Sequence, residues 1–168
     1  MPCPKICAII LASGKGSRFG MPKAEALLET GETFLQRVQS LVRDAGFDGI
    51  RSVVGCDTPD MLSSLRQGIS ECPGVDAYLV FPVDFPLVSQ ETLQILKEAC
   101  AEYPGIVIKP SFRGTKGHPI IIPGNIDLSA EDETGGLAEL IRRQGLTVLE
   151  VPVEDPGILR NINYPGDL

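Results

Sequence analysis

Apolar segments alternate with segments of helical periodicity along most of the chain. Lys5–Ala12 is almost continuously apolar, which is typical of a strand buried on both faces of a sheet. Gln36 follows Thr33 by three positions ahead of an apolar helical stripe, which predicts a capped helix ending at Gly46. The same two patterns predict strands at Ile50–Val54, Ala77–Phe81, Ile106–Lys109, Pro119–Ile122, Leu146–Val151 and Leu159–Ile162, and helices at Thr58–Ile69, Ser89–Glu102 and Thr134–Gln144.

This alternation indicates an α/β protein, a three-layer α/β/α sandwich with a mostly parallel sheet. The turn residues RGTKG separate two of the expected strands and predict a hairpin there. The length suits a single core, so we expect residues 1–168 to form one domain. Ligands of such sheets bind beyond the carboxyl ends of the strands. The loops after the first and third expected strands are therefore the candidate binding loops.

The charge balance argues against a nucleic-acid-binding surface. The chain has 22 acidic and 15 basic residues and a net charge of -7, which is the wrong sign for binding a duplex. No apolar run approaches the ~20 residues of a membrane helix and no secretory signal is evident, so we expect a cytoplasmic protein. The five cysteines are scattered and the chain has one histidine, so we expect reduced thiols and no structural zinc site.

The loop after the first strand has the composition of a phosphate-binding loop. The segment LASGKGSRFGMPK has neither the Walker A pattern nor the glycine spacing of a dinucleotide-binding fingerprint. Its glycines would let backbone N–H groups approach phosphate oxygens, Arg18 could make a forked contact, and Lys23 could supply a point charge. A solvated surface turn is the alternative. Three cations at the binding edge of an acidic chain favour phosphate.

The loop after the third strand, PVDFP, contains a single carboxylate, Asp84. Aspartate often caps a turn, so a structural role is one interpretation. The other is that Asp84 holds Mg²⁺, which would bridge the phosphates bound by the first loop. The presence of both loops at the same edge favours the metal site.

Five segments, in order along nearly the whole chain, resemble the MobA-like nucleotidyltransferases, and most closely their molybdenum cofactor cytidylyltransferase (MocA) type. They are LASGKGSRFGMPK, DMLSSLRQGI, FPVDFPLVSQETL, RGTKGHPIII and DPGILRNINYPGDL. The resemblance implies a Rossmann-like nucleotidyltransferase fold. It also implies transfer of an NMP, CMP from CTP before GTP or another NTP, onto a phosphorylated acceptor such as molybdopterin, with release of pyrophosphate.

The resemblance also implies roles for individual residues. Arg18, Lys23 and Asp84 would form the catalytic set, with Mg²⁺ on Asp84. The nucleotide-binding residues would be Leu11, Ala12, Ser13, Gly14, Gly16, Arg18, Lys23, Ser64 and Gly68. Near the acceptor would lie His118, Asn161 and Asn163.

The chain departs from the family pattern most clearly between Val54 and Asp60. Family members carry a helix and another strand there, so the sheet is expected to be shortened at one edge. Ser13 replaces the alanine or glycine that is common at its position, which leaves the base open. Two alternatives remain: another phospho-acceptor, such as a sugar phosphate, or a catalytically weak nucleotide-binding homologue. A molybdoenzyme or another cofactor-biosynthesis protein would be the protein partner.

Overall fold

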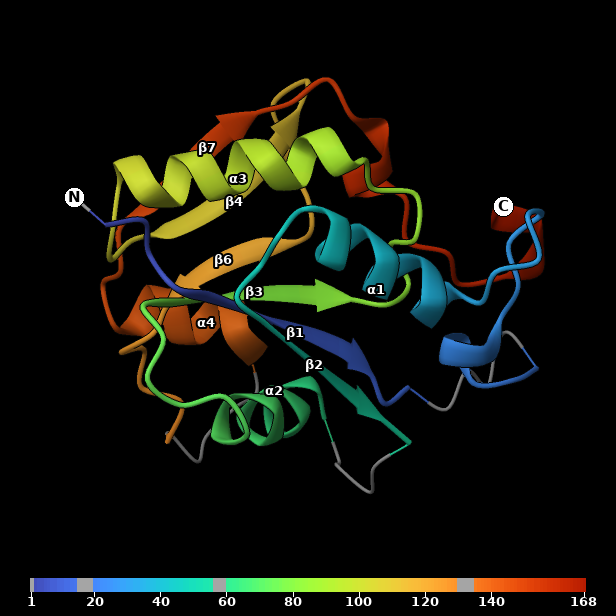
Figure 1. The fold of residues 1–168 in the computed structure, drawn as a ribbon, viewed down its shortest axis with the longest axis horizontal. Coiled ribbons are helices and arrows are strands. Elements are labelled where there is room, and N and C mark those ends of the chain that lie inside the picture. The colour runs from blue at the N-terminus through green and yellow to red at the C-terminus, as the bar shows by residue number, and fades with distance from the viewer. Residues whose placement is uncertain (1, 15–19, 56–59, 130–134) are drawn as a thin grey trace.

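The computed structural model describes residues 2–14, 20–55, 60–129 and 135–168 (Figure 1). The strands are β1 (Ile6–Ala12), β2 (Gly49–Val54), β3 (Ala77–Pro82), β4 (Val107–Phe112), β5 (Thr115–Lys116), β6 (Ile120–Pro123) and β7 (Val148–Pro152). The α-helices are α1 (Phe34–Asp44), α2 (Met61–Ser70), α3 (Gln90–Glu102) and α4 (Gly136–Arg143). Three short 3₁₀ helices are η1 (Lys23–Glu25), η2 (Pro156–Leu159) and η3 (Pro165–Asp167).

The strands form one seven-stranded sheet in the order β2-β1-β3-β6-β4-β5, with β7 also paired to β4. The pairs β1–β2, β1–β3 and β4–β7 are parallel, whereas β6 runs antiparallel to both β3 and β4. Strands β1, β2, β3, β4 and β7 therefore point the same way, which confirms the expected mostly parallel sheet. Strand β2 lies at the edge of the sheet and ends at Val54, the residue after which the shortening is expected.

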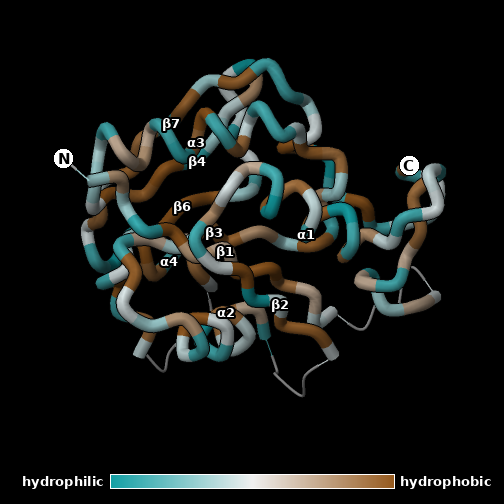
Figure 2. The backbone as a smooth tube through the Cα atoms, in the orientation of Figure 1, coloured by the Kyte–Doolittle hydropathy of each residue, from teal (hydrophilic) through white to brown (hydrophobic). Residues whose placement is uncertain are grey.

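Helices cover both faces of the sheet, as the alternating pattern predicted. Helices α1 and α3 belong to one apolar cluster and α2 and α4 to the other, and successive β1 residues such as Ile10 and Leu11 point into opposite clusters. In Figure 2 the strands are mostly brown, whereas teal residues recur along the covering helices. Burial on both faces explains why β1 is continuously apolar. The described residues contain no helix that is long and apolar enough to cross a membrane.

The register of β1 and β3 brings the two candidate loops together. Leu11 pairs with Pro82 at the carboxyl ends of these parallel strands. The N–H of Val83 then donates to the carbonyl oxygen of Leu11 at 2.9 Å. The loop after β1 and the PVDFP turn after β3 thus begin side by side, as expected for the binding edge of such a sheet.

Two of the predicted helix starts, with their capping residues, are confirmed. Thr33 caps α1 through a reciprocal pair: Gln36 N donates to Thr33 Oγ1 at 3.1 Å, and Thr33 N donates to Gln36 Oε1 at 2.9 Å. Ser89 caps α3 by accepting from Thr92 N at 3.2 Å. These caps satisfy backbone donors that have no partner inside the helix, so a local sequence signal sufficed to place them.

Two other helix starts were predicted wrongly. Helix α2 is capped by Asp60, whose carboxylate accepts from Ser63 N at 2.8 Å, and not by the predicted Thr58-Pro59 pair, which lies outside the described residues. An ionised carboxylate is a strong acceptor for these donors, which explains the later start. The N-cap of α4 is Gly135 instead of Thr134, which also lies outside the described residues.

The predicted strand at Leu159–Ile162 is wrong, and one strand was missed. Leu159 ends η2, and the Ile162 N–H donates at 2.8 Å to the carbonyl oxygen of Asp84 instead of joining a ladder. The predicted antiparallel pairing of β4 with β6 is confirmed. However, the tight hairpin joins β4 to the short β5, where Arg113 and Gly114 both have positive φ, as a two-residue type I′ turn requires.

Candidate active site

The candidate site centres on the ammonium group of Lys23. Its Nζ lies 2.8 Å from Asp84 Oδ2 and 2.7 Å from Asn163 Oδ1. The Lys23 and Asp84 side chains are only 17% and 20% exposed, so the ion pair is partly shielded from water. Three segments that are distant in sequence therefore meet here: the loop after β1, the turn after β3 and the C-terminal segment.

The C-terminal segment is held in place by a buried carboxylate that the sequence reasoning did not single out. Asp155 Oδ2 accepts from Ser89 N at 2.8 Å and from Thr92 Oγ1 at 2.7 Å, and its Oδ1 accepts from Gly157 N at 2.9 Å. These bonds fix η2 against the start of α3. Gly157 packs so closely on Leu87 that a side chain would collide with its backbone. The aspartate and glycine of the DPG triplet were the available signal.

Ser13 and Ser64 are brought together on the other side of the loop after β1. Their hydroxyl oxygens are 2.7 Å apart, and Ser64 Oγ also donates to the carbonyl oxygen of Asp60 at 3.2 Å. Ser64 is fully buried in α2, whereas Gly14 is exposed, and a Cβ added to Gly14 would have no atom of the described residues within 4 Å. Among the described residues, the backbone at Gly14 is therefore accessible, close to a hydrogen-bonded serine pair.

Other expected site residues lie apart from this centre or beyond what the structure describes. Leu11 and Ala12 are the buried end of β1. Gly68 faces the sheet, where an added Cβ would lie 2.5 Å from Ile9 Cγ2, so packing accounts for this glycine. Asn161 is exposed, and no side-chain contact to the described residues is recorded for it. Gly16 and Arg18 lie outside the described residues.

His118 lies next to the Asp84 turn but is not part of the Lys23 cluster. Its ring centroid is 4.8 Å from that of Phe85, and its backbone N–H donates to the carbonyl oxygen of Ile158 at 2.9 Å. Its Nδ1 is buried and has no hydrogen-bond partner among the described residues. Burial lowers the pKa of His118, with nearby Lys109 lowering it further and Asp84 opposing the shift. The imidazole is therefore neutral near pH 7.

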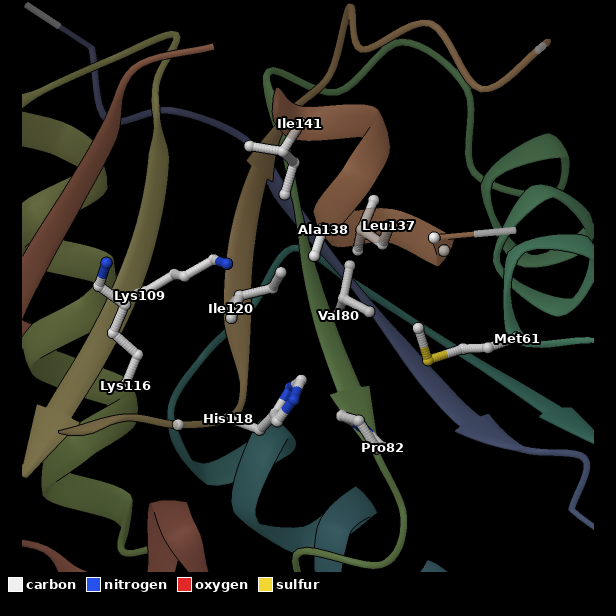
Figure 3. Close-up of a pocket in the computed structure, with 13 residues that line it drawn as sticks. Met61, Val80, Pro82, Lys109, Lys116, His118, Ile120, Leu137, Ala138 and Ile141 are labelled. Atoms are coloured by element: carbon white, nitrogen blue, oxygen red, sulfur yellow. The ribbon is translucent and has the colours of Figure 1, made fainter. Parts of the chain in front are cut away.

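A pocket of about 280 Å³ opens beside His118 (Figure 3). Most of its wall comes from strands β3, β4, β5 and β6 and from the start of α4. The lining residues are Met61, Val80, Pro82, Lys109, Lys116, Gly117, His118, Ile120, Gly135, Gly136, Leu137, Ala138 and Ile141. None of them is acidic, although the chain as a whole is. The sequence reasoning noted His118 but missed both lysines.

The two side-chain oxygens that contact the Lys23 ammonium would also suit a small hard cation. Asp84 Oδ2 and Asn163 Oδ1 already converge on one positive charge, the lysine ammonium. The described residues contain no cluster of three or more side chains of the metal-ligating types His, Cys, Asp and Glu. Mg²⁺ usually needs only one or two protein carboxylates because substrate phosphates and waters complete its shell. Asp84, with Asn163 beside it, therefore fits Mg²⁺ held jointly with a phosphorylated ligand.

Comparison with known proteins finds a similar sequence and similar folds. A molybdenum cofactor guanylyltransferase from Rhizobium meliloti (strain 1021) is 28% identical over 197 residues, covering 96% of this chain and 88% of the relative. The 2-C-methyl-D-erythritol 4-phosphate cytidylyltransferase from Thermus thermophilus has a similar structure, with a TM-score of 0.67 at 18% identity over 95% of this chain and 94% of that one. A Mycobacterium tuberculosis H37Rv protein in complex with manganese also has a similar structure, with a TM-score of 0.69 at 20% identity over 89% of this chain and 88% of that one.

A family model decides the assignment. It describes the MobA-like NTP transferase domain and matches residues 8–151, from β1 into β7. The matched range includes Lys23, Asp84 and the pocket beside His118. The chain belongs to the MobA-like NTP transferase domain family and is a nucleotidyltransferase.

Proposed function

We propose that the protein transfers an NMP, CMP from CTP in the first instance, onto a phosphorylated acceptor such as molybdopterin, with Mg²⁺ as the cofactor. The observation that carries this proposal is the convergence of Lys23 with Asp84 and Asn163 at the binding edge of the sheet. An ammonium, a carboxylate and an amide from three distant segments meet there. The ammonium would offset the negative charge of a triphosphate, and the two oxygen ligands would offset the positive charge of its metal.

The reaction needs alignment and charge neutralisation more than covalent help. A phosphate oxygen of the acceptor attacks the α-phosphorus of the triphosphate. The new P–O bond forms as the bond to the β-phosphate oxygen breaks, and that oxygen leaves with the electron pair as pyrophosphate. Lys23, together with Arg18 and the loop at Gly14 and Gly16, binds the negative phosphates. Asp84 would hold Mg²⁺, which would supply positive charge at the transferred phosphoryl group.

The base of the nucleotide would be recognised near the start of α2. The backbone of Leu11 to Gly14 and the partly exposed hydroxyl of Ser13, which the buried Ser64 holds in place, offer hydrogen-bonding groups there. The Ser13 oxygen remains able to accept a hydrogen bond, which suits the polar edge of cytosine or guanine. GTP is the second candidate donor because the curated relative is a guanylyltransferase.

The acceptor would lie on the opposite side of the Asp84 turn, beside His118 and Asn163, with Asn161 nearby. The pocket next to His118 is adjacent to Pro82, two residues before Asp84. Another phosphorylated alcohol is the second candidate acceptor class, because the Thermus thermophilus structure is named for a 4-phosphate of this kind. A molybdoenzyme or another cofactor-biosynthesis protein would then receive the product.

The decisive experiment measures pyrophosphate release from CTP and GTP with Mg²⁺ and a panel of phosphorylated acceptors that includes molybdopterin. We expect release with CTP and the pterin, and a loss of at least ~100-fold in Asp84→Asn, because removing a charged group that acts on the transferring phosphoryl costs this much. Asp44→Asn is the matched control, since Asp44 is an exposed carboxylate at the end of α1. Nucleotide binding without turnover of any acceptor, or full activity in Asp84→Asn, would contradict the proposal.

A further inference from the structure

The three ionisable side chains that the described residues contribute to the pocket beside His118 are all bases. Lys109 comes from β4, Lys116 from β5, and His118 from the turn before β6. Lys116 has a long ion pair of 3.6 Å with Glu150 and remains half exposed. Lys109 is half-buried and has no recorded hydrogen bond or ion pair with the described residues. In Figure 3 its side chain extends from β4 toward Ile120.

A half-buried ammonium that has no counter-ion among the described residues is costly, so the surroundings of Lys109 favour an anion. Burial and the neighbouring Lys116 both lower the pKa of Lys109, because each destabilises its charged form. An anion in the pocket would offset this penalty for Lys109.

The start of α4 adds donors to the same pocket. Gly135, Gly136, Leu137 and Ala138 all line it, and the N-cap Gly135 has no side chain with which to cap the helix. The first N–H groups of a helix have no partner within it and carry partial positive charge. Gly135 must remain a glycine because a Cβ there would collide with Glu139. These donors therefore reinforce the two lysines.

This basic pocket is distinct from the Lys23 centre. Neither Lys23 nor Asp84 lines it, and His118 lies between the two places, in ring contact with Phe85. The remaining wall is apolar, formed by side chains such as Val80, Ile120 and Leu137. Hydroxyl groups of a sugar would find few partners on this wall, and burying them unpaired would be unfavourable.

We propose that Lys109 and Lys116 form a second anion site, which binds a further acidic group of the acceptor while its reacting phosphate lies at the Lys23 centre. The acceptor is accordingly a compact molecule with two anionic groups and a body poor in hydroxyls. This inference rests on the proposed function for the identity of the ligand, but the anion site itself is testable without a nucleotide.

The first test uses pyridoxal 5′-phosphate followed by borohydride. The aldehyde condenses with an unprotonated lysine amine, losing water, and hydride reduces the imine to a stable adduct that peptide mass spectrometry locates. We expect labelling of Lys109 before the exposed Lys5, protection by inorganic phosphate, and weaker labelling of Lys109 in Lys116→Met. Labelling that simply follows solvent exposure, or that inorganic phosphate does not reduce, would overturn the anion site.

The second test uses whichever panel acceptor is turned over. We expect Lys109→Met to raise the acceptor KM about tenfold, because a charge-assisted contact is lost, while kcat and the nucleotide KM stay within about twofold. Lys5→Met is the control because it removes the same charge from an exposed position. A raised nucleotide KM would assign the pocket to the donor instead. If no acceptor is turned over, the proposed function fails, and the labelling result still decides the anion site.

Discussion

The Lys23 ammonium lies 2.8 Å from Asp84 Oδ2, the carboxylate that we propose as the metal ligand. The pair is only about one-fifth exposed, and Asn163 provides a second oxygen to the same charge. Lys23 therefore balances the charge of Asp84. Under the proposed function, a triphosphate would offer Lys23 a new anionic partner and would free the carboxylate for Mg²⁺.

Replacing Lys23 should separate metal binding from catalysis. In Lys23→Met we expect Mn²⁺ to bind about tenfold more tightly in the absence of nucleotide, because the competing ammonium is gone. Pyrophosphate release should fall by ~100-fold or more, because a charge on the transferring phosphates is also lost. Electron paramagnetic resonance of free Mn²⁺ measures the first effect and a pyrophosphate assay the second. Unchanged Mn²⁺ binding relative to a Lys5→Met control would refute the competition.

Removing the Asp155 carboxylate should destabilise the protein. The side chain is buried and accepts from Ser89 N, Thr92 Oγ1 and Gly157 N. Asp155→Ala leaves these donors unsatisfied, so we expect the free energy of unfolding in urea to fall by about 3 kcal/mol. Asp44→Asn should change it by less than about 0.5 kcal/mol, as is usual for surface substitutions. A loss in Asp155→Ala no larger than in this control would contradict the anchoring role.

His118 should make stability depend on pH. Burial lowers the pKa of the folded imidazole below its ordinary 6.5, so the unfolded chain binds more protons at mildly acidic pH. Stability is therefore present in full above about pH 6.5 and is lost as the pH falls toward the folded pKa, by at most about 1.4 kcal/mol per pH unit. Urea unfolding between pH 7.5 and 5.5 should show this slope in the wild type and a shallower one in His118→Gln. Equal slopes would disprove the assignment.

Gly68 should prove necessary for packing. An added Cβ would lie 2.5 Å from Ile9 Cγ2 and 3.1 Å from Val53 Cγ2. We expect Gly68→Ala to reduce the free energy of unfolding by about 1–3 kcal/mol through overpacking between α2 and the sheet. Gly166→Ala is the matched control because a Cβ added there would have nothing within 4 Å. Normal stability with weakened nucleotide binding would instead support a direct role at the base.

Local signals in the sequence located much of the fold because they act over a few residues. The capping box at Thr33 and Gln36 and the cap at Ser89 were found where the structure has them. By contrast, Leu159–Ile162 is apolar enough for a strand, yet the Ile162 N–H bonds to the Asp84 carbonyl oxygen instead of a neighbouring strand. Asp84 is distant in the sequence and lies in a turn, so no local pattern reveals this partner.

By itself, the sequence determined the alternating strands and helices and the two candidate loops, and it predicted Arg18, Lys23 and Asp84 as the chemistry-bearing residues within them. Burial on both faces and helix capping are local or periodic requirements, which is why they can be read along the chain. Only the tertiary structure decided that Asn163 would share the Lys23 charge and that Lys109, Lys116 and the start of α4 would border one pocket. These groups meet through strand register and long-range packing, and such contacts depend on the whole sheet.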